Sequence, residues 1–319
     1  MLYQNSKMAK VVQISILAKI SGNVNADEVI GTRVTLKKMY SSSGEVLPFV
    51  SARAIKFAIR QVLKERGFEV DPFSVNPEAR ETLRLTDSAR PNKYIDNDIF
   101  GYMRTIGRGE RAIRRQAPIA ISYLKALKDT PIKAEFAARF PRPWGEEEAP
   151  GPFEIEVAEF IGKVNCIMYD YIGNFEQDIK IAKSIGENIK EIKEFLEEVP
   201  ERLPIEERKR RIEAFAEVFL TPTYVLPRRT NSLNIPEYIA ALIVLSEKGP
   251  LPVFQYLGFD FENNKVDIKS LEVMMKREEI KEAKPKILFI DYFDNVEQLP
   301  EGIKKVNVKT AVEEIKNFL

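Results

Sequence analysis

The chain has 319 residues, of which 44% are hydrophobic and 30% charged, and its formal net charge is +1. This profile is that of an ordinary soluble globular protein with one elaborate domain or two. Histidine is absent and Cys166 is the single cysteine. These counts exclude a histidine-dependent nucleophile, an imidazole general base, a structural zinc site and an intramolecular disulfide framework.

Membrane association and cofactor binding are not predicted. No apolar run reaches the ~18 residues of a membrane span, and the first ten residues lack the apolar core of a signal peptide. A single cysteine is typical of a reducing compartment, so we expect a cytoplasmic protein. The chain has no glycine-rich phosphate loop of the GxxxxGK[ST] type. We expect no cofactor, and any metal would have to be a hard ion held by carboxylates.

The first regular pattern is the alternation of apolar and polar residues from Val11 to Ile20, which predicts a strand. Its polar side carries Gln13, Ser15 and Lys19 and is predicted to face solvent or a ligand. A second strand is predicted over residues 32–40.

A hairpin turn at 41–44 and a strand at 46–50 lead into a predicted helix that begins after Ser51 and stops at Gly67. Four cations follow one another on this helix at intervals of three, four and four: Arg53, Lys56, Arg60 and Lys64. Such residues are neighbours on a helix, so they form one stripe, opposite an apolar stripe. The helix has no acid before Glu65, which suits a polyanion; a merely solvated face is the alternative.

Residues 68–150 are rich in Pro, Asn, Asp and Arg and are interpreted as an insertion with short helices near 77–85 and 119–128. Residues 100–143 hold ten Lys or Arg against three acids, a net charge of +7. Localised positive charge in a nearly neutral chain is typical of a nucleic-acid groove.

The last half of the chain alternates between strand and helix patterns. Strands are predicted at 153–157, 161–172 and 286–293, helices at 187–198, 206–219 and 236–248, and a strand followed by a helix at 306–319. The spacing of Val164, Cys166 and Met168 places the cysteine on an apolar face, as a small core residue. The order of elements predicts an α+β fold with a ferredoxin-like or RNA-recognition-like sheet.

Several segments resemble one known family. They are Asn23-Val-Asn25, Thr35-Leu-Lys-Lys38, Leu47-Pro-Phe-Val-Ser51 and the cations Arg53, Lys56 and Arg60. Together they resemble the DevR-type autoregulator family, a branch of the CRISPR-associated backbone subunits that form the filament of type I Cascade effector complexes. Similar pieces at 114–122, 203–212 and 235–242 extend the resemblance from about residue 11 to 245.

The resemblance implies a palm, a helical fingers insertion and a thumb-like loop. We assign the palm to 9–67, 153–222 and 285–319, the fingers to 68–152, and a helical and loop elaboration to 223–284. Copies would stack along a CRISPR guide RNA and hold its backbone, leaving the bases free to pair with target DNA. The predicted partners are the guide RNA, target DNA indirectly, other Cascade subunits and further copies of the chain.

The predicted RNA-binding residues combine the family-like motifs with two arginine pairs in presumed loops. They are Asn23, Asn25, Lys37, Lys38, Ser51, Arg53, Lys56, Arg60, Arg114, Arg115, Arg228 and Arg229. Lys56 and Arg60 are expected to be exposed. An acidic set is expected to face a basic surface of the next copy or to repel misplaced RNA: Glu146–Glu148, Glu154, Glu156 and Glu159.

Two other functions remain open. Some relatives cut target RNA with a loop aspartate and a divalent metal, and Asp27, beside Glu28, is the acid best placed for that here. Those relatives carry the aspartate slightly later, where this chain has Gly31-Thr-Arg33, so we predict a non-catalytic subunit. The second alternative is a regulator that binds single-stranded RNA on its own.

Overall fold

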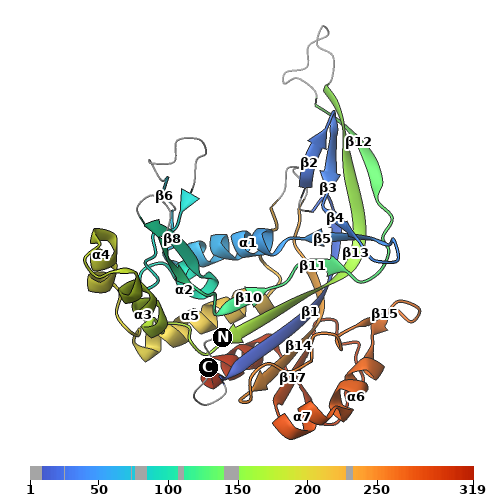
Figure 1. Cartoon of the computed structure of the whole chain (residues 1–319). Helices are drawn as coiled ribbons and strands as arrows, with labels where there is room; N and C mark the ends of the chain where they lie inside the picture. Colours follow the sequence, from blue (N-terminus) through green and yellow to red (C-terminus); the bar gives the residue numbers. More distant parts are fainter. Residues whose placement is uncertain are drawn as a thin grey trace.

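The computed structural model describes residues 9–24, 26–72, 74–75, 85–106, 111–139, 151–227 and 233–319, which form an α+β fold (Figure 1). The strands are β1 Val11–Gly22, β2 Ala26–Ile30, β3 Arg33–Leu36, β4 Lys38–Tyr40, β5 Val46–Val50, β6 Ser74–Val75, β7 Leu85–Thr86, β8 Tyr102–Ile106, β9 Arg111–Arg115, β10 Ile119–Ile121, β11 Leu124–Ala126, β12 Lys133–Arg139, β13 Gly151–Tyr169, β14 Glu237–Ser246, β15 Phe259–Asp260, β16 Lys265–Val266, β17 Lys286–Asp291 and β18 Ile303–Lys305. The helices are α1 Ala52–Glu65, α2 Ile95–Phe100, α3 Glu176–Ile185, α4 Lys190–Glu198, α5 Ile205–Leu220, α6 Ile268–Lys276, α7 Glu278–Ala283 and α8 Val308–Phe318. Over these ranges, none of the helices has the length and apolar character needed to cross a membrane.

The main sheet is built around β1, which lies between β13 and β14 and is antiparallel to both. Its strand order is β18-β17-β14-β1-β13-β11-β5-β4, and β10 also pairs with β13. Strand β1 is buried on both faces, because Gln13 and Ser15 are only 2% and 1% exposed. The predicted solvent-facing or ligand-facing side is therefore wrong at Gln13 and Ser15, whereas the Lys19 side chain is 41% exposed. The Gln13 amide exchanges hydrogen bonds with the backbone of Leu251, and Ser15 Oγ donates to Asn165.

Helices α1, α5 and α8 cover one face of the sheet (Figure 1). Ile55 and Ile59 of α1 share a buried cluster with Phe215 and Phe219 of α5 and with Ile14 of β1. Burial of each such side chain stabilises the fold by roughly 1.5–3 kcal/mol. Helix α5, predicted at 206–219, is thus a central element of this layer.

The segment between β14 and β17 covers part of the opposite face. Leu271 and Met274 of α6 and Ile280 of α7 form a second buried cluster with Leu242 of β14 and Phe289 of β17. Strands β14 and β17 are consequently buried from both sides. This double burial explains why their sequences are almost continuously apolar.

Several predicted elements differ from the observed ones. The helix predicted at 236–248 is strand β14, and the helix predicted at 119–128 is the pair of short strands β10 and β11. The two strands predicted at 153–157 and 161–172 are the single strand β13, and the strand predicted at 32–40 is divided into β3 and β4. The strands at 11–20, 46–50 and 286–293 and the basic helix are confirmed.

The described part of the predicted fingers insertion is mainly β structure. Its one helix there is the six-residue α2, so the predicted helical character is wrong for these residues, and most of the helix predicted near 77–85 lies outside them. Tyr102 and Ile113 of the β8–β9 hairpin are buried with Phe175 and with Phe195 of α4. The β8–β9 hairpin therefore packs against α3 and α4.

Another part of the molecule projects from the main sheet, and we call it the arm. It consists of β2, β3, β12 and the first half of β13 (Figure 1). Strands β12 and β13 pair from Lys133↔Val157 to Arg139↔Gly151, and β3 adds to β13 in parallel. The arm exposes large apolar side chains, including Ile30 at 60% and Phe136 at 72%.

Candidate nucleic-acid interface

Helix α1 starts directly after the sheet strand β5. Ser51 caps it as predicted, because its Oγ accepts a hydrogen bond from the Ala54 amide at 3.2 Å. Gly67 has the positive φ of +83° that ends the helix. With Ile55 and Ile59 fixed in the core, the cation stripe must lie on the outer side of the helix. Ser51 therefore has a structural role that accounts for its position without RNA.

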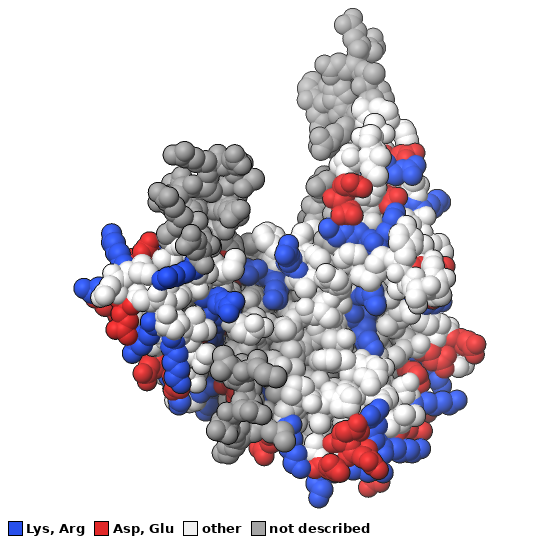
Figure 2. All heavy atoms as spheres, in the orientation of Figure 1, with Lys and Arg blue, Asp and Glu red and all other residues white. Residues whose placement is uncertain are grey.

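The two ends of the stripe are free. Arg53 and Lys64 are exposed, and neither has an acidic partner anywhere in the described ranges. Lys and Arg side chains lie over α1 on the floor of a hollow between the arm and the β8–β9 side of the molecule (Figure 2). This arrangement leaves positive charge accessible in a concave surface.

The two middle cations of the stripe are tied to helix α2. Lys56 Nζ and the Arg60 guanidinium lie 5.0 and 5.1 Å from the centroid of the Phe100 ring. Arg60 Nε also donates to the buried Asp96 at 3.0 Å. Burial lowers the pKa of Lys56, and the nearby charge of Arg60 lowers it further. Both residues are only partly exposed, contrary to the prediction.

Replacing Arg60 by alanine is expected to lower the free energy of unfolding by about 1–3 kcal/mol, because Asp96 loses its charged partner in a buried position. Burial already raises the pKa of Asp96, despite the Asp71 amide and Arg60. The loss should therefore shrink as the pH falls and Asp96 takes up a proton. Urea denaturation at several pH values measures this.

The matched control is Lys56→Ala, which removes a cation from the same Phe100 ring without leaving an acid unpaired. It should cost less than about 1 kcal/mol. Equal destabilisation by the two substitutions would contradict a structural role for the Arg60–Asp96 pair.

The adjacent arginines Arg114 and Arg115 point to opposite sides of strand β9. Arg114 is exposed, as an RNA-binding residue requires. The side chain of Arg115 is 2% exposed and donates to Asp98 at 2.8 Å and to Asp178 at 2.7 Å. It also donates to three backbone carbonyls. The prediction that Arg115 lines the groove is wrong, because its charge is already compensated inside the protein.

Asp98 of α2 is the centre of a buried ionic network that the sequence did not reveal. Besides Arg115, it accepts from Arg211 of α5 at 2.9 Å, and Gly173 donates a backbone hydrogen bond to it at 3.0 Å. Both guanidinium groups are almost completely buried. The network joins α2, β9 and α5, and it fixes the β8–β9 hairpin relative to the sheet.

The predicted polar residues near β3 and β4 are mostly engaged within the chain. Asn23 is buried and its amide donates to the Glu156 carbonyl at 2.7 Å, so it is not available to RNA. Lys37 pairs with Asp27 at 3.0 Å, and Lys38 pairs with Glu156 at 3.0 Å. Burial opposes the ionisation of Glu156, but the Leu36 amide and Lys38 outweigh it and lower its pKa. Both lysines remain partly exposed.

A pocket of about 570 Å³ lies beside these residues, and it brings Asp27 and Glu28 near Glu154 and Glu156. Each of three carboxylates faces a cation: Asp27 faces Lys37, Glu154 faces Arg33, and Glu156 faces Lys38. No cluster of three His, Cys, Asp or Glu that could hold a metal occurs among the residues described.

Three predicted RNA-binding residues lie outside the described residues: Asn25, Arg228 and Arg229. The acidic segment Glu146–Glu148 also lies outside them. The other acids of that set do not offer free negative charge to a neighbouring copy. Glu154 pairs with Arg33 in the arm, Glu156 pairs with Lys38 of β4, and Glu159 pairs with Lys19 at 3.2 Å.

Comparison with known proteins identifies the family. The sequence matches the model of the family "CRISPR-associated negative auto-regulator DevR/Csa2" over residues 20–269. No curated protein matches it. A chain of a "CRISPR RNA-guided surveillance complex, pre-nicking" is similar in fold, with a TM-score of 0.55 and 10% identity over 96% of this chain and 100% of that chain. A chain of a "CRISPR RNA-guided surveillance complex" gives 0.53 and 11% over 95% and 99%. Because the family model spans most of the sequence, the chain belongs to the CRISPR-associated DevR/Csa2 family, as its sequence motifs predict.

Proposed function

We propose that the protein is a non-catalytic backbone subunit of a type I CRISPR effector complex that holds the guide RNA along α1. The observation that carries this proposal is the cation stripe of α1, whose Arg53 and Lys64 are exposed and lack acidic partners in the part of the chain that the structure describes. The similar fold of chains from RNA-guided surveillance complexes supports it.

The arrangement of the central strands supports an RNA-recognition-like palm. Taken in chain order, β1, α1, β10 with β11, β13, α5 and β14 give the order βαββαβ. In the sheet these strands lie in the order β14-β1-β13-β11, and the neighbours are antiparallel. This is the order of the ferredoxin-like motif. In this proposal β14 belongs to the palm, although residues 223–284 were assigned to a separate elaboration.

The chemistry of the stripe fits a backbone grip. A subunit that accepts any guide must contact phosphate and sugar, because base-edge contacts would select particular sequences. Exposed Arg and Lys side chains on one helix face meet that requirement, and they leave the bases free to pair with target DNA. The partners of this cytoplasmic antiviral assembly are then the guide RNA, other Cascade subunits and further copies of the chain.

The same reasoning extends to assembly. One copy covers only a short stretch of RNA, so many copies must tile a guide. A head-to-tail contact that does not close produces a filament. The arm, with its exposed apolar residues, is the best candidate for the thumb that reaches a neighbouring copy.

Target-RNA cutting by Asp27 is the less favoured function. Its carboxylate lies 3.0 Å from Lys37 Nζ, and a divalent metal would have to displace that cation. The carboxylates of Glu154 and Glu156, which line the same pocket, are likewise paired with Arg33 and Lys38.

Purified protein is expected to carry RNA of one discrete size with CRISPR repeat sequence. When RNA is added in length steps, the mass from light scattering should rise by one subunit per fixed number of nucleotides, because each copy holds one stretch of backbone. Labelled complementary RNA should stay intact in these assemblies with magnesium or manganese.

A dimer whose mass ignores the RNA length would contradict the filament and favour a stand-alone regulator. Metal-dependent cleavage that disappears in Asp27→Ala would instead make the protein a target-RNA nuclease.

A further inference from the structure

The face of the sheet opposite α1 carries a row of side chains across three strands. Lys125 of β11 lies directly opposite Phe49 of β5 and Lys163 of β13. Directly opposed residues of antiparallel strands point to the same face. Their chain neighbours Val50 and Leu124 are buried in the cluster under α1, so Phe49, Lys125 and Lys163 lie on the other face.

This row contains an accessible aromatic platform. The Tyr123 ring stacks on Phe49, with 5.0 Å between ring centroids and an interplanar angle of 29°. Tyr123 is 50% exposed. Lys125 beside it is exposed and meets no acid within the described ranges. Lys163 is fixed differently, because its amine donates to the carbonyls of Phe254 and Leu257.

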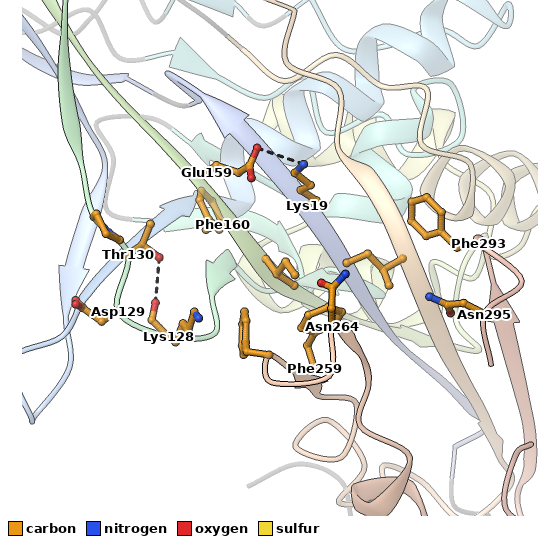
Figure 3. Close-up of a pocket in the computed structure, with 14 residues that line it drawn as sticks. Lys19, Lys128, Asp129, Thr130, Glu159, Phe160, Phe259, Asn264, Phe293 and Asn295 are labelled. Carbon is orange, nitrogen blue, oxygen red and sulfur yellow. Dashed lines mark hydrogen bonds and ion pairs between the residues drawn. The ribbon is translucent and has the colours of Figure 1, made fainter. Parts of the chain in front are cut away.

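A pocket of about 510 Å³ is lined in part by Ile161, two residues before Lys163 on β13, and Figure 3 shows its lining. Its lining includes Phe259, Phe261, Phe293, Asn264, Asn295 and Lys128. The pocket is connected to the platform through β5, because the backbone amide of its lining residue Thr130 donates to the carbonyl of Val46 at 3.0 Å, and Phe49 lies on the same strand. The pocket size is that of typical small-ligand sites.

Among the described residues that line the pocket, Lys128 has no acidic partner and Asp129 has no cationic one. Glu159 is paired with Lys19, and Asp129 accepts a hydrogen bond from the Val46 amide at 2.7 Å. Lys128 Nζ lies 3.9 Å from the centroid of the Phe261 ring and has no acidic partner in the described part of the chain. Lys125 and Lys128 therefore both offer free positive charge next to aromatic rings.

We propose that this face is a second binding surface for single-stranded nucleic acid. A base stacks on Tyr123, the following phosphates lie beside Lys125 and Lys128, and a further base enters the pocket, where the two asparagine amides can reach its edge. Protein interfaces are depleted in lysine, so unpaired lysines beside aromatic rings favour a nucleic acid over a protein partner. The surface is separate from α1, which packs on the opposite face.

The first test measures binding of ten-nucleotide RNA and DNA strands. In a background of Arg53→Glu with Lys64→Glu, which disables the α1 stripe, residual binding should weaken about tenfold in Tyr123→Ala and stay unchanged in Tyr123→Phe. Reversal of Lys125 and Lys128 to Glu should make the salt dependence shallower by about 0.7 per lost phosphate contact. The charge-matched control is Lys269→Glu with Lys276→Glu on α6, which should change nothing.

A stacking readout completes the test. The fluorescence of Tyr123→Trp should be quenched by either strand, beyond any change shown by the wild-type protein, whose single tryptophan is Trp144. In assembled guide complexes, a photoreactive base placed in turn in the guide, the complementary strand and the displaced DNA strand should crosslink to the peptide containing Tyr123 from at least one of them, which identifies the source.

Unchanged binding in both sets of variants, with no quenching, would overturn the proposal even if the α1 grip is confirmed. If the variants instead reduce self-association without nucleic acid, the face is a docking site between copies, and the proposal also fails. Complete loss of binding of the ten-nucleotide strands in the α1 background would also overturn it, because no second surface would then be holding them.

Discussion

Replacing Asp98 by alanine is expected to lower the free energy of unfolding by about 3–5 kcal/mol, because it breaks a buried ionic network. The carboxylate accepts from Arg115 and Arg211, whose side chains are 2% and 3% exposed. Without Asp98, each buried guanidinium group keeps a single acidic partner among the described residues, Asp178 for Arg115 and Glu207 for Arg211. Urea denaturation followed by circular dichroism measures the change.

The control is the pair between Arg90 and Glu198, in which both side chains are more than 40% exposed. Glu198→Ala should change the free energy of unfolding by less than about 1 kcal/mol, because solvent screens exposed pairs. Asp98→Asn keeps the shape of the side chain but removes its charge. Its loss in the free energy of unfolding should lie between those of Asp98→Ala and Glu198→Ala. If Asp98→Ala is as stable as Glu198→Ala, the network does not hold α2, β9 and α5 together.

Reversing Arg53 and Lys64 to Glu together is expected to weaken guide RNA binding by about 100-fold while leaving the unfolding midpoint unchanged. In the proposed grip each residue would contribute a charge-assisted contact to RNA, and each such contact is worth roughly tenfold. Both side chains are exposed and unpaired within the described ranges, so the fold does not depend on them. Fluorescence anisotropy with labelled guide RNA at several salt concentrations measures the affinity.

Reversal of Lys56 and Arg60 would change both RNA binding and stability, because Arg60 also pairs with the buried Asp96. Reversal of Arg53 and Lys64 avoids that second effect. The α6 reversal Lys269→Glu with Lys276→Glu has the same charge change and should bind RNA like the wild type. An affinity within twofold of wild type for the α1 variant would show that the stripe is only a solvated helix face.

The elements that the sequence predicts correctly are those whose signal is local. The cap at Ser51, the stop at Gly67 and the two stripes of α1 follow from residues within one helix. The position of Cys166 in the core, 1% exposed, follows from the alternation around it. The raised pKa of this buried thiol agrees with an inert core residue.

The elements that the sequence misses depend on distant partners. Strand β14 is apolar on both faces because it is sandwiched between two layers, and such a run cannot be distinguished from a buried helix by periodicity. Arg114 and Arg115 form one charge patch in sequence, but strand alternation separates them, and Asp178, which pairs with Arg115, lies 63 residues away. Tyr123 and Phe49 likewise meet only through sheet pairing.

Strand β13 runs for 19 residues without interruption, a length of about 60 Å. Its first residues pair with β12 in the arm, and the rest pair with β1 in the centre of the sheet. Arm and core therefore share one continuous hydrogen-bonded strand, and no loop interrupts β13 where it passes from one to the other. In an assembly of copies, this continuous strand would hold the arm at a fixed position relative to the core. The protein would then set the spacing between neighbouring subunits, and a longer RNA would recruit more copies at the same spacing.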